Sequence, residues 1–464
     1  MDALCRLSAA ELAALIASGE ASSREVVEAH LERIGEVNGH VNAVTVVLRE
    51  SALAAADAAD AVPRGSAKSP FHGVPFTVKE NIDCLGSATT HGVPALEHSM
   101  PSRDAPVVAR MKAAGAIVVG RTNLPEFALR LCTDNPLRGS TLNPWNAHLT
   151  PGGSSGGEAA ALATGMTPFG LGNDLGGSLR NPAYCCGVAA LKPTLGRIPR
   201  ACSIPPLDWG MATQLMAVEG PMARSVADLR LGLSVLAGRD IRDPRSVDAS
   251  LEGPTPIARR AALVMSIAGA EIPAETVTEI ERAGRILADA GWQVEPAEPP
   301  ELGLVHQTWL DVLSIDFAVL MPRIRSLVTP PVYDYVMELC RASDARSRPN
   351  SEIHATRSRL ARLWSAFFER YPVAVGPTWT QLPWPADADL VPGTGVELVL
   401  DTTRFITAGN VLGIPSVALP TGAVAGLPTG IQIYADLWRE DLCLEAAEIV
   451  ESGVHRPTPI DPLR

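Results

Sequence analysis

Clustered positive charge is scarce in this sequence. Its 464 residues include 39 Lys and Arg against 51 Asp and Glu, which gives a formal net charge of −12. Proteins that bind nucleic acid depend on clustered Lys and Arg to neutralise phosphate groups, so the composition argues against nucleic acid as the main partner. An acidic surface favours solubility but does not identify a substrate.

Cysteine motifs are also missing. The eight cysteines are scattered without C-x-x-C spacing, which excludes the common zinc-site patterns. A disulfide framework is not expected in so long a chain. Cys185 and Cys186 are adjacent in an apolar run, and we interpret them as two small buried hydrophobic residues. The sequence therefore predicts no metal and no cofactor.

Targeting and membrane signals are a third absence. The first residues, MDALCRLSAAELAALIASGE, lack the basic, apolar and cleavage regions of a signal peptide and indicate the start of a helix. No window is expected to approach the ~18 apolar residues of a membrane span. We therefore expect a cytoplasmic enzyme, monomeric or homodimeric, without a membrane partner.

The composition that is present is globular, with 46% hydrophobic and 19% charged residues. Short apolar runs alternate with helical segments, and a helix over Ala105–Ala114 lies between two of the runs. This alternation predicts an α/β fold whose buried sheet has helices on both faces. The predicted strands are Val74–Val78, Ala116–Val119, Phe169–Gly172, Val188–Leu191, Ala262–Met265, Val373–Val375, Ser416–Leu419 and Gly430–Tyr434.

Two later segments have distinct compositions. Leu304–Phe368 has a predominantly helical pattern, and its bulky residues form either a core-facing stripe or a cap over a catalytic centre. Arg239–Ala258 is rich in Asp, Arg and Pro and is interpreted as a loop or a subdomain junction. Breaks in the helical segment are expected at Pro322, Pro330, Pro331 and Pro349.

The most informative segment covers residues 151–182, PGGSSGGEAAALATGMTPFGLGNDLGGSLRNP. Serines flanked by glycines occur at Ser154 and Ser155 and again at Ser178. Glycine neighbours leave the hydroxyl and the backbone amide groups open to close approach. This arrangement suits a serine nucleophile beside an oxyanion site, provided that a base lies nearby.

The base is not found among the nine histidines, because none of them lies in a motif. No G-x-S-x-G elbow with a following Asp and His is present, which weakens an α/β-hydrolase interpretation. Lys79 ends the apolar run Pro75–Lys79, where a strand would leave the sheet. Desolvation at such a position favours the neutral amine, which accepts a proton. Lys79 is therefore the candidate base, with a structural or surface role as the alternative.

Lys79 and the two serine sites lie within three longer segments, HGVPFTVKENID, TPGGSSGGEAAALATG and GLGNDLGGSLRNPAYCCGVAALKPTLGRIP. In order and spacing, these segments closely resemble the successive signature blocks of the amidase signature family. Weaker resemblance continues in GPMARSVADL, NVLGIPSVALPTG and LPTGIQIYA. The clear similarity covers about residues 70–230 and 405–435.

The resemblance implies a single domain over residues 1–464, with a mixed central β-sheet flanked by helices on both faces. Its catalytic core would span about residues 70–235 and 370–464. Residues from about 300 to 370 would form a helical cap-like region.

The resemblance also implies the chemistry. Ser178 matches the nucleophile and Lys79 the base, and Ser154 matches the bridging serine, which the family holds through a cis peptide bond with its neighbour. Neutral Lys79 would take the Ser154 proton as Ser154 takes that of Ser178. Ser155 is expected to hydrogen-bond within this relay. The implied oxyanion hole consists of the backbone N–H groups of Leu175, Gly176, Gly177 and Ser178.

Four residues near the serines are compared with the family pattern. Asp174 and Arg180 match shared positions, and they are expected either to hold the catalytic loops by hydrogen bonds or to form a plain salt bridge. Asn173 stands where Thr is common, and Glu158 stands where Ser is frequent. We expect both variants to be tolerated and neither to touch the three catalytic positions.

The stretch Ala201–Val218 departs further, because related glutaminyl-tRNA amidotransferase subunits carry a Ser/Tyr-rich pattern there. It is interpreted as a lid or acyl-pocket wall, with core packing as the alternative. The substrate-pocket candidates from this stretch and from the helical region are Trp209, Met211, Leu215, Trp309, Phe317 and Met321.

The resemblance implies a hydrolase that cleaves C–N bonds of amides through an acyl-enzyme on Ser178. Its substrate would be uncharged and partly apolar or aromatic, and the motifs leave carbamates (urethanes), aryl acylamides and esters open. A carboxylate-bearing substrate would need a basic residue such as Arg130 or Arg138. The alternative function is an amidotransferase subunit that hydrolyses glutamine or asparagine to supply ammonia within a complex. A binding protein with an anion-binding glycine nest is a third interpretation, but no G-x-x-x-x-G-K-[ST] motif is present.

Overall fold

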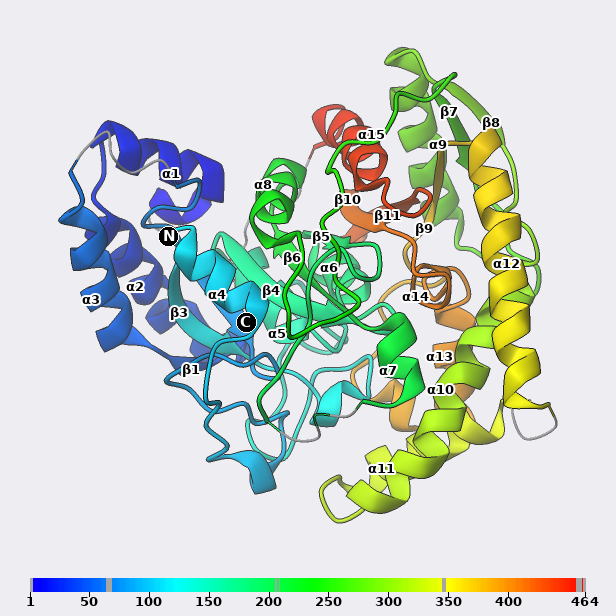
Figure 1. Cartoon of the computed structure of the whole chain (residues 1–464), viewed down its shortest axis with the longest axis horizontal. Helices are drawn as coiled ribbons and strands as arrows, with labels where there is room; N and C mark the ends of the chain where they lie inside the picture. Colours follow the sequence, from blue (N-terminus) through cyan, green and yellow to red (C-terminus); the bar gives the residue numbers. More distant parts are fainter. Residues whose placement is uncertain are drawn as a thin grey trace.

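A mixed β-sheet of eleven strands forms the centre of the protein (Figure 1). The computed structural model describes residues 3–63, 69–204, 207, 209–343, 348–455 and 461. The strands are β1 (Val44–Val47), β2 (Pro75–Lys79), β3 (Ile117–Thr122), β4 (Phe169–Asp174), β5 (Ala189–Lys192), β6 (Val218–Ala223), β7 (Arg260–Leu263), β8 (Gln293–Pro296), β9 (Val373–Pro377), β10 (Ser416–Val424) and β11 (Leu427–Tyr434). Their order across the sheet is β1-β3-β2-β4-β6-β5-β10-β11-β9-β7-β8.

The sheet combines parallel and antiparallel pairs. β2 runs parallel to both β3 and β4, and β7 runs parallel to β8 and β9. Between these two blocks, each neighbouring pair from β4 to β9 is antiparallel. β1 is antiparallel to β3 at one edge. The predicted α/β fold with a mixed central sheet is confirmed, and β2, β4 and β6 lie side by side.

Fifteen α-helices surround the sheet in the described part of the chain. Capping boxes of Ser8 with Glu11 and of Ser22 with Glu25 begin the first two helices. The α-helices are α1 (Ala9–Ser18), α2 (Ser23–Val41), α3 (Arg49–Asp60), α4 (Pro106–Ala113), α5 (Gly156–Ala163), α6 (Arg180–Cys186), α7 (Met211–Met216), α8 (Val226–Leu236), α9 (Ala274–Asp289), α10 (Leu302–Ile324), α11 (Pro330–Arg341), α12 (Asn350–Arg370), α13 (Gly395–Thr402), α14 (Ala408–Val411) and α15 (Glu440–Ser452). Short 3-10 helices cover Leu4–Arg6, Pro94–Leu96, Glu126–Ala128 and Ala388–Leu390.

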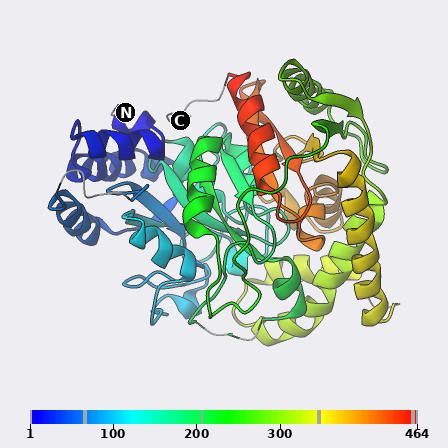
Figure 2. The ribbon, with the colours of Figure 1, turned by 45° about the horizontal axis from the view of Figure 1, so that its top comes forward.

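Side chains of β2 alternate between the two faces of the sheet. Phe76 and Val78 enter one hydrophobic core, to which α4, α8, α9 and α15 contribute. Figure 2 shows α8 and α15 side by side on this face. Because the strand period is two residues, Thr77 and Lys79 point to the opposite face. There a second core is built by α2, α3, α5 and α6.

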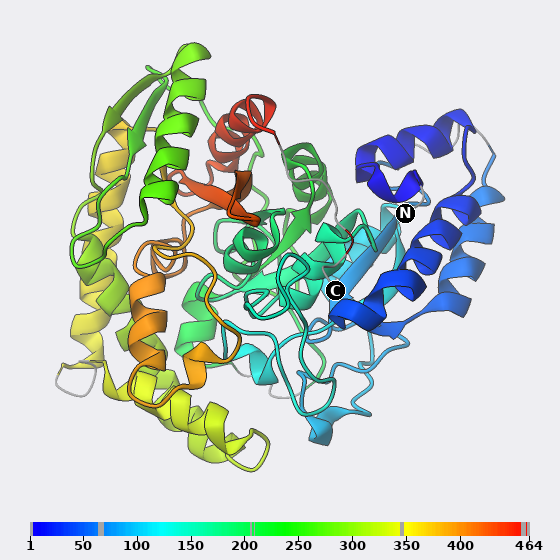
Figure 3. The same cartoon turned by 180° about the vertical axis from the view of Figure 1, so that it is seen from behind.

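α11 and α12 pack against α10 at the end of the molecule opposite to α2 and α3 (Figures 1 and 3). With α13 they form a third hydrophobic core, which includes Met321 and Trp364. α10 is long and apolar enough to cross a membrane by length and composition alone, so the expectation that no segment would be was wrong. In the folded protein, 56% of this apolar window is buried, which is the pattern of a core helix.

All eight predicted strands are present, although their ends are shifted. β1, β6 and β8 were not predicted. β1 and β8 have only four residues each, and β6 contains Gly220-Pro221, a pair that usually marks a turn. Residues 239–258 form a loop between α8 and β7.

One predicted helix break is wrong. α10 continues through Pro322 to Ile324. The missing N–H of Pro322 costs a single hydrogen bond near the end of the helix, where few backbone bonds remain to be made. The other prolines lie at element boundaries as predicted, since Pro330 and Pro331 begin α11 and Pro349 precedes α12.

Gly157, in the first turn of α5, allows a close approach of this helix to the sheet. A Cβ atom at Gly157 would lie 2.4 Å from the backbone nitrogen of Asn123, which cannot move aside cheaply. Gly157→Ala should therefore lower the free energy of unfolding, measured with urea, by about 3 kcal/mol. In α2, nothing lies within 4 Å of a Cβ at Gly35. Gly35→Ala should raise stability by about 1 kcal/mol, and equal effects of the two variants would contradict this packing.

Candidate active site

Lys79 lies at the C-terminal end of β2 and is completely buried. Its Nζ atom is 2.7 Å from Ser154 Oγ and 3.0 Å from Ser155 Oγ. The third neighbour of Nζ is Asn173 Oδ1, at 2.8 Å. The predicted base therefore contacts the predicted bridging serine directly.

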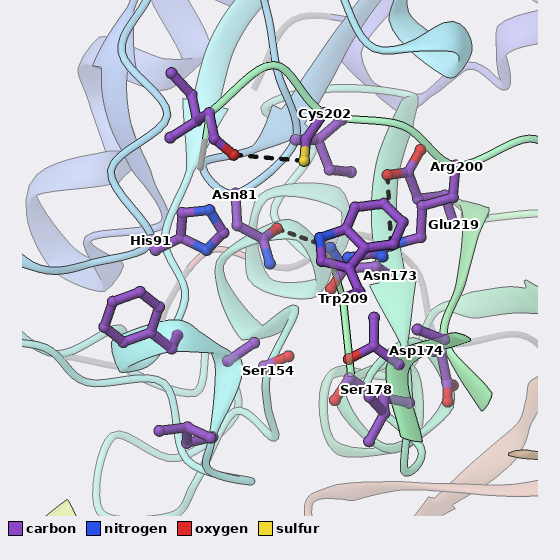
Figure 4. A pocket seen from close by; sticks show the side chains of 18 of the residues that line it. Asn81, His91, Ser154, Asn173, Asp174, Ser178, Arg200, Cys202, Trp209 and Glu219 are labelled. Carbon is purple, nitrogen blue, oxygen red and sulfur yellow. Dashed lines mark hydrogen bonds and ion pairs between the residues drawn. The ribbon is translucent and has the colours of Figure 1, made fainter. Parts of the chain in front are cut away.

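Ser154 and Ser155 lie in the glycine-rich loop before α5. The peptide bond between Gly153 and Ser154 is cis. The Ser155 amide donates a hydrogen bond to the Ser178 carbonyl at 3.2 Å, which joins this loop to the second serine site. Ser154 and Ser178 line the same cavity (Figure 4). The structure thus brings the three predicted catalytic residues to one place.

Burial shifts two ionisable groups in this region. Desolvation lowers the pKa of Lys79 well below its ordinary value, although the negative charges of Asp174 and Glu158 act in the opposite direction. Burial also raises the pKa of Glu158, in α5, to about 7, although hydrogen bonds from Thr77 and Thr122 oppose the shift. A lysine that is neutral near neutral pH can act as a proton acceptor.

Asn173 contacts Lys79, so the expectation that it touches none of the three catalytic positions was wrong. β2 and β4 are parallel neighbours, and their C-terminal ends bring the two side chains together. The Asn173 Nδ2 atom donates to Asn81 Oδ1 at 2.8 Å, which orients the amide with its oxygen toward the lysine. Glu158, in contrast, accepts hydrogen bonds from Thr77 and Thr122 rather than from the catalytic residues.

The hydrogen bonds around Lys79 Nζ direct its lone pair. A neutral amine has two N–H donors and one lone pair. Asn173 Oδ1 can only accept, so it takes one N–H. Ser155 Oγ donates to the Asn173 carbonyl at 3.4 Å, and its oxygen takes the second N–H. The lone pair then faces Ser154, whose hydroxyl proton it can accept.

The turn before Ser178 needs glycine at two positions. Gly177 has a φ of +107°, which L side chains rarely adopt. A Cβ atom on Gly176 would lie 2.7 Å from Trp309 Cζ2. Trp309, from α10, also donates its Nε1–H to the Leu175 carbonyl at 3.1 Å. α10 therefore packs directly against the turn that presents Ser178.

Asp174 holds the same turn through hydrogen bonds. Its carboxylate accepts from the amides of Gly177 at 2.8 Å and Leu179 at 3.1 Å. It also pairs with Arg180 at 3.0 Å, and both side chains are fully buried. Burial acts to raise the pKa of Asp174, but the charge of Arg180 outweighs it and holds this pKa below its ordinary value. The pair therefore contacts the turn as well as forming a salt bridge.

Three backbone amides of the turn are open. Among the described residues, the amides of Leu175, Gly176 and Ser178 have no hydrogen-bond acceptor. The Gly177 amide is bound to Asp174 instead. The predicted set of four oxyanion donors is thus reduced to three that can receive a ligand oxygen in this structure.

A cavity of about 220 Å³ lies beside Ser178 (Figure 4). One wall is apolar and is formed by residues 127–129 and by α10, which contributes Phe317, Leu320 and Ile324 at helical spacing. A smaller cavity of about 60 Å³ adjoins it. The polar side chains of the opposite wall include Asn81, Asp83, His91, Arg200 and Glu219.

Three of the six predicted pocket residues line these cavities. Trp209 and Phe317 line the larger cavity, and Trp309 lines the smaller one. Residues 205, 206 and 208 of the predicted lid or wall segment lie outside the described residues. The remainder of that segment does form part of the wall, through residues such as Cys202 and Ile204.

The other three pocket predictions are wrong. Met211 is 46% exposed, Met321 is completely buried in the third core, and Leu215 packs against that core. Helix geometry explains the error, since only one side of a short helix faces the cavity. In α7 that side is formed by Thr213 and Ala217, four positions apart.

Several polar residues of the cavity were missed by the sequence analysis. The Arg200 guanidinium group lies over the Trp209 ring at 3.7 Å. Glu219 lies opposite Asn173 in the register of β4 and β6. A charged residue inside an otherwise apolar strand was the available signal for Glu219. Burial lowers the pKa of His91 to about 4, so this ring is neutral at physiological pH.

The two arginines suggested for a carboxylate-bearing substrate are already paired. Arg130 binds Asp389 at 2.8 Å, and Arg138 binds Glu80 at 2.7 Å.

Cys185 and Cys186 are completely buried, as predicted, and burial raises the pKa of both thiols. No group of His, Cys, Asp and Glu suited to a metal ion occurs among the residues that the structure describes.

Known proteins resemble this chain over nearly its whole length. The model of a family described as Amidase matches residues 25–444. An indoleacetamide hydrolase from Bradyrhizobium diazoefficiens is 41% identical over 450 residues, which cover 96% of this chain and 86% of that protein. A glutamyl-tRNA(Gln) amidotransferase subunit from a Roseiflexus species is 32% identical, with 97% and 96% covered. The solved structure of a 6-aminohexanoate cyclic dimer hydrolase matches with a TM-score of 0.82 and 28% identity, and covers 98% of this chain and 99% of its own.

Removal of Asp174 should expose the cost of the buried charge of Arg180. Asp174→Ala leaves that guanidinium without its counter-ion and the turn without two hydrogen bonds. The free energy of unfolding in urea should fall by about 3–5 kcal/mol. Glu448 is the control, because its pair with Arg230 is 36–40% exposed, and Glu448→Ala should cost at most about 1 kcal/mol. Similar losses for both variants would show that Asp174 contributes no more than a surface ion pair.

Proposed function

The chain belongs to the amidase family and is an amide hydrolase, and from this premise we propose that it cleaves small, neutral aryl amides, with primary arylacetamides as the preferred class. The observation that carries the proposal is the buried Lys79 amine, 2.7 Å from Ser154 Oγ at the edge of a cavity that Ser178 also lines. A desolvated amine, a hydroxyl relay and a second serine are the parts that acyl transfer requires.

The proposed reaction begins at Ser178. Its Oγ atom attacks the amide carbonyl carbon while Ser154 Oγ accepts its proton and passes its own proton to the Lys79 amine. Negative charge develops on the carbonyl oxygen, and the open amides of the turn 175–178 stabilise it. The relay requires Lys79 to be uncharged at the start, which its desolvation favours.

Collapse of the tetrahedral intermediate breaks the C–N bond. The proton returns from Lys79 through Ser154 to the leaving nitrogen, which departs from a primary amide as ammonia. Water then gives a proton to the same relay and attacks the acyl-enzyme ester. The carboxylic acid leaves and Ser178 regains its proton, so each cycle consumes one amide and one water.

Two observations support an aromatic acyl group. The cavity is lined by the rings of His91, Phe127, Trp209 and Phe317, and aromatic rings bind other rings through their faces and edges. The relative from Bradyrhizobium diazoefficiens is an indoleacetamide hydrolase, and its name describes an arylacetamide substrate. Carbamates, anilides and esters would follow the same acyl-enzyme route with a different leaving group, and we include them as secondary substrates.

A second candidate is the ammonia-supplying component of an amidotransferase complex. The 32% identity to the Roseiflexus protein over 97% of this chain favours it. Glutamine and asparagine carry an α-carboxylate, and Arg130 and Arg138 are already engaged with carboxylates of the protein. We therefore rank this function second. A cytoplasmic location and a monomeric or homodimeric state stay predictions.

A substrate panel on the isolated chain tests the proposal. Ammonia or amine release is measured with indole-3-acetamide, an anilide, a carbamate and glutamine. We expect kcat/KM for indole-3-acetamide to exceed that for glutamine by roughly 100-fold or more. Ser178→Ala and Lys79→Ala should remove turnover, and a fluorophosphonate probe should label only Ser178. A preference for glutamine, or turnover that requires a partner protein, would support the amidotransferase role instead.

Asn173→Asp tests whether Lys79 is the proton acceptor. A carboxylate 2.8 Å from Nζ would stabilise the ammonium form and raise the pKa of Lys79. Because activity requires the neutral amine, which predominates above this pKa, the acid limb of the kcat/KM profile should move to higher pH. Each unit of that rise lowers kcat/KM about tenfold at a pH below the limb.

Asn173→Thr is the matched control, since it adds no charge next to Lys79. Its acid limb should stay close to that of the wild type, whatever its effect on the rate. An acid limb that does not move in the Asp variant would remove Lys79 as the base.

A further inference from the structure

Glu219 is a buried carboxyl group in the cavity wall that lacks close partners. It lies in β6 opposite Asn173 and is 4% exposed. Among the described residues, Oε2 has no hydrogen-bond partner, and Oε1 approaches only Arg200 Nε, at 4.0 Å. A buried polar group without a partner is costly to the folded protein, so its presence in an active-site cavity indicates contact with a ligand.

Arg200 is under-bonded in the same way. Within the described part of the chain, its Nε and Nη1 atoms have no hydrogen-bond partner. Its guanidinium group is stacked on the Trp209 ring at 3.7 Å. Arg200, Trp209 and Glu219 all line the cavity that contains Ser178 (Figure 4). They form a polar subsite beside the catalytic residues.

The charges of this subsite favour a neutral ligand. A carboxylate on the substrate would face Glu219 and Asp83, and a cation would face Arg200. Burial raises the pKa of Glu219 to about 8, although Arg200 opposes the shift. Near neutral pH the carboxyl group therefore offers a carbonyl acceptor with little negative charge. The complementary group is a neutral N–H.

The place of Glu219 in the sheet indicates which part of the substrate it meets. Neighbouring strands lie ~4.8 Å apart, and Asn173, directly opposite Glu219, contacts the Lys79 amine. Glu219 is thus about one strand away from the proton relay. A ring attached to an acetamide whose carbonyl lies at Ser178 would reach it.

We propose that Glu219 determines specificity by accepting a hydrogen bond from a ring N–H of an aromatic acyl group, with Arg200 and Trp209 beside that ring. The inference rests on the proposed function, because it concerns the acyl group of the arylacetamide. It selects N–H heteroaromatic acyl groups from within that class.

Three substrates of the wild-type enzyme separate the hydrogen bond from ring shape. Indole-3-acetamide has a ring N–H, 1-methylindole-3-acetamide has it blocked, and naphthalene-1-acetamide lacks it. We expect kcat/KM for indole-3-acetamide to exceed both of the others by about 10- to 100-fold. Equal values for the indole and naphthalene compounds would overturn the inference and leave arylacetamide hydrolysis standing. Failure to hydrolyse any of the three would remove the proposed function, and the inference with it.

Two variants assign the preference to Glu219. Glu219→Leu has no acceptor and should reduce kcat/KM for indole-3-acetamide to the naphthalene value, without changing the naphthalene value. Glu219→Gln keeps a carbonyl acceptor and should keep part of the preference. Full retention of the preference in the Leu variant would overturn the inference. If the Leu variant does not fold, as thermal unfolding would reveal, the wild-type comparison and the Gln variant decide.

Discussion

The removal of water from around Lys79 is the constraint on which the rest of the site depends. Two carboxyl groups lie near enough to favour its ammonium form, those of Asp174 and Glu158. The charge of Asp174 is paired with Arg180, and Glu158, with a pKa raised to about 7, is only partly ionised at neutral pH. Desolvation therefore outweighs attraction, and the amine is left free to accept a proton.

The turn that presents Ser178 is held from two directions. Asp174, at the end of β4, binds two of its amides, and Trp309 of α10 binds the Leu175 carbonyl. The same helix supplies Phe317 to the wall of the cavity. Because one rigid helix contacts both the turn and the acyl-binding wall, substrate shape and the position of the nucleophile are mechanically linked.

The residues that were predictable from sequence are those with a local signal. Lys79 ends an apolar run, and Ser154 and Ser178 lie between glycines, so residue order alone pointed to them. Asn173 was misjudged because its contact with Lys79 depends on the pairing of β2 with β4, which no local pattern encodes. Glu219 was missed together with β6, whose Gly-Pro pair resembles a turn. The wrong prediction for Met321 has another cause, since closeness in sequence does not tell which side of a helix faces a cavity.

The parallel pairing of β2 with β4 has a consequence for folding. It joins Lys79 to Asn173, 94 positions apart, while Arg180 reaches Asn410 across 230 positions. Contacts between such distant parts of a chain pay a large loop-closure entropy and are formed slowly. A molecule that has collapsed without this pair would contain every catalytic residue but no relay. Regain of activity during refolding would therefore report completion of the sheet rather than compaction of the chain.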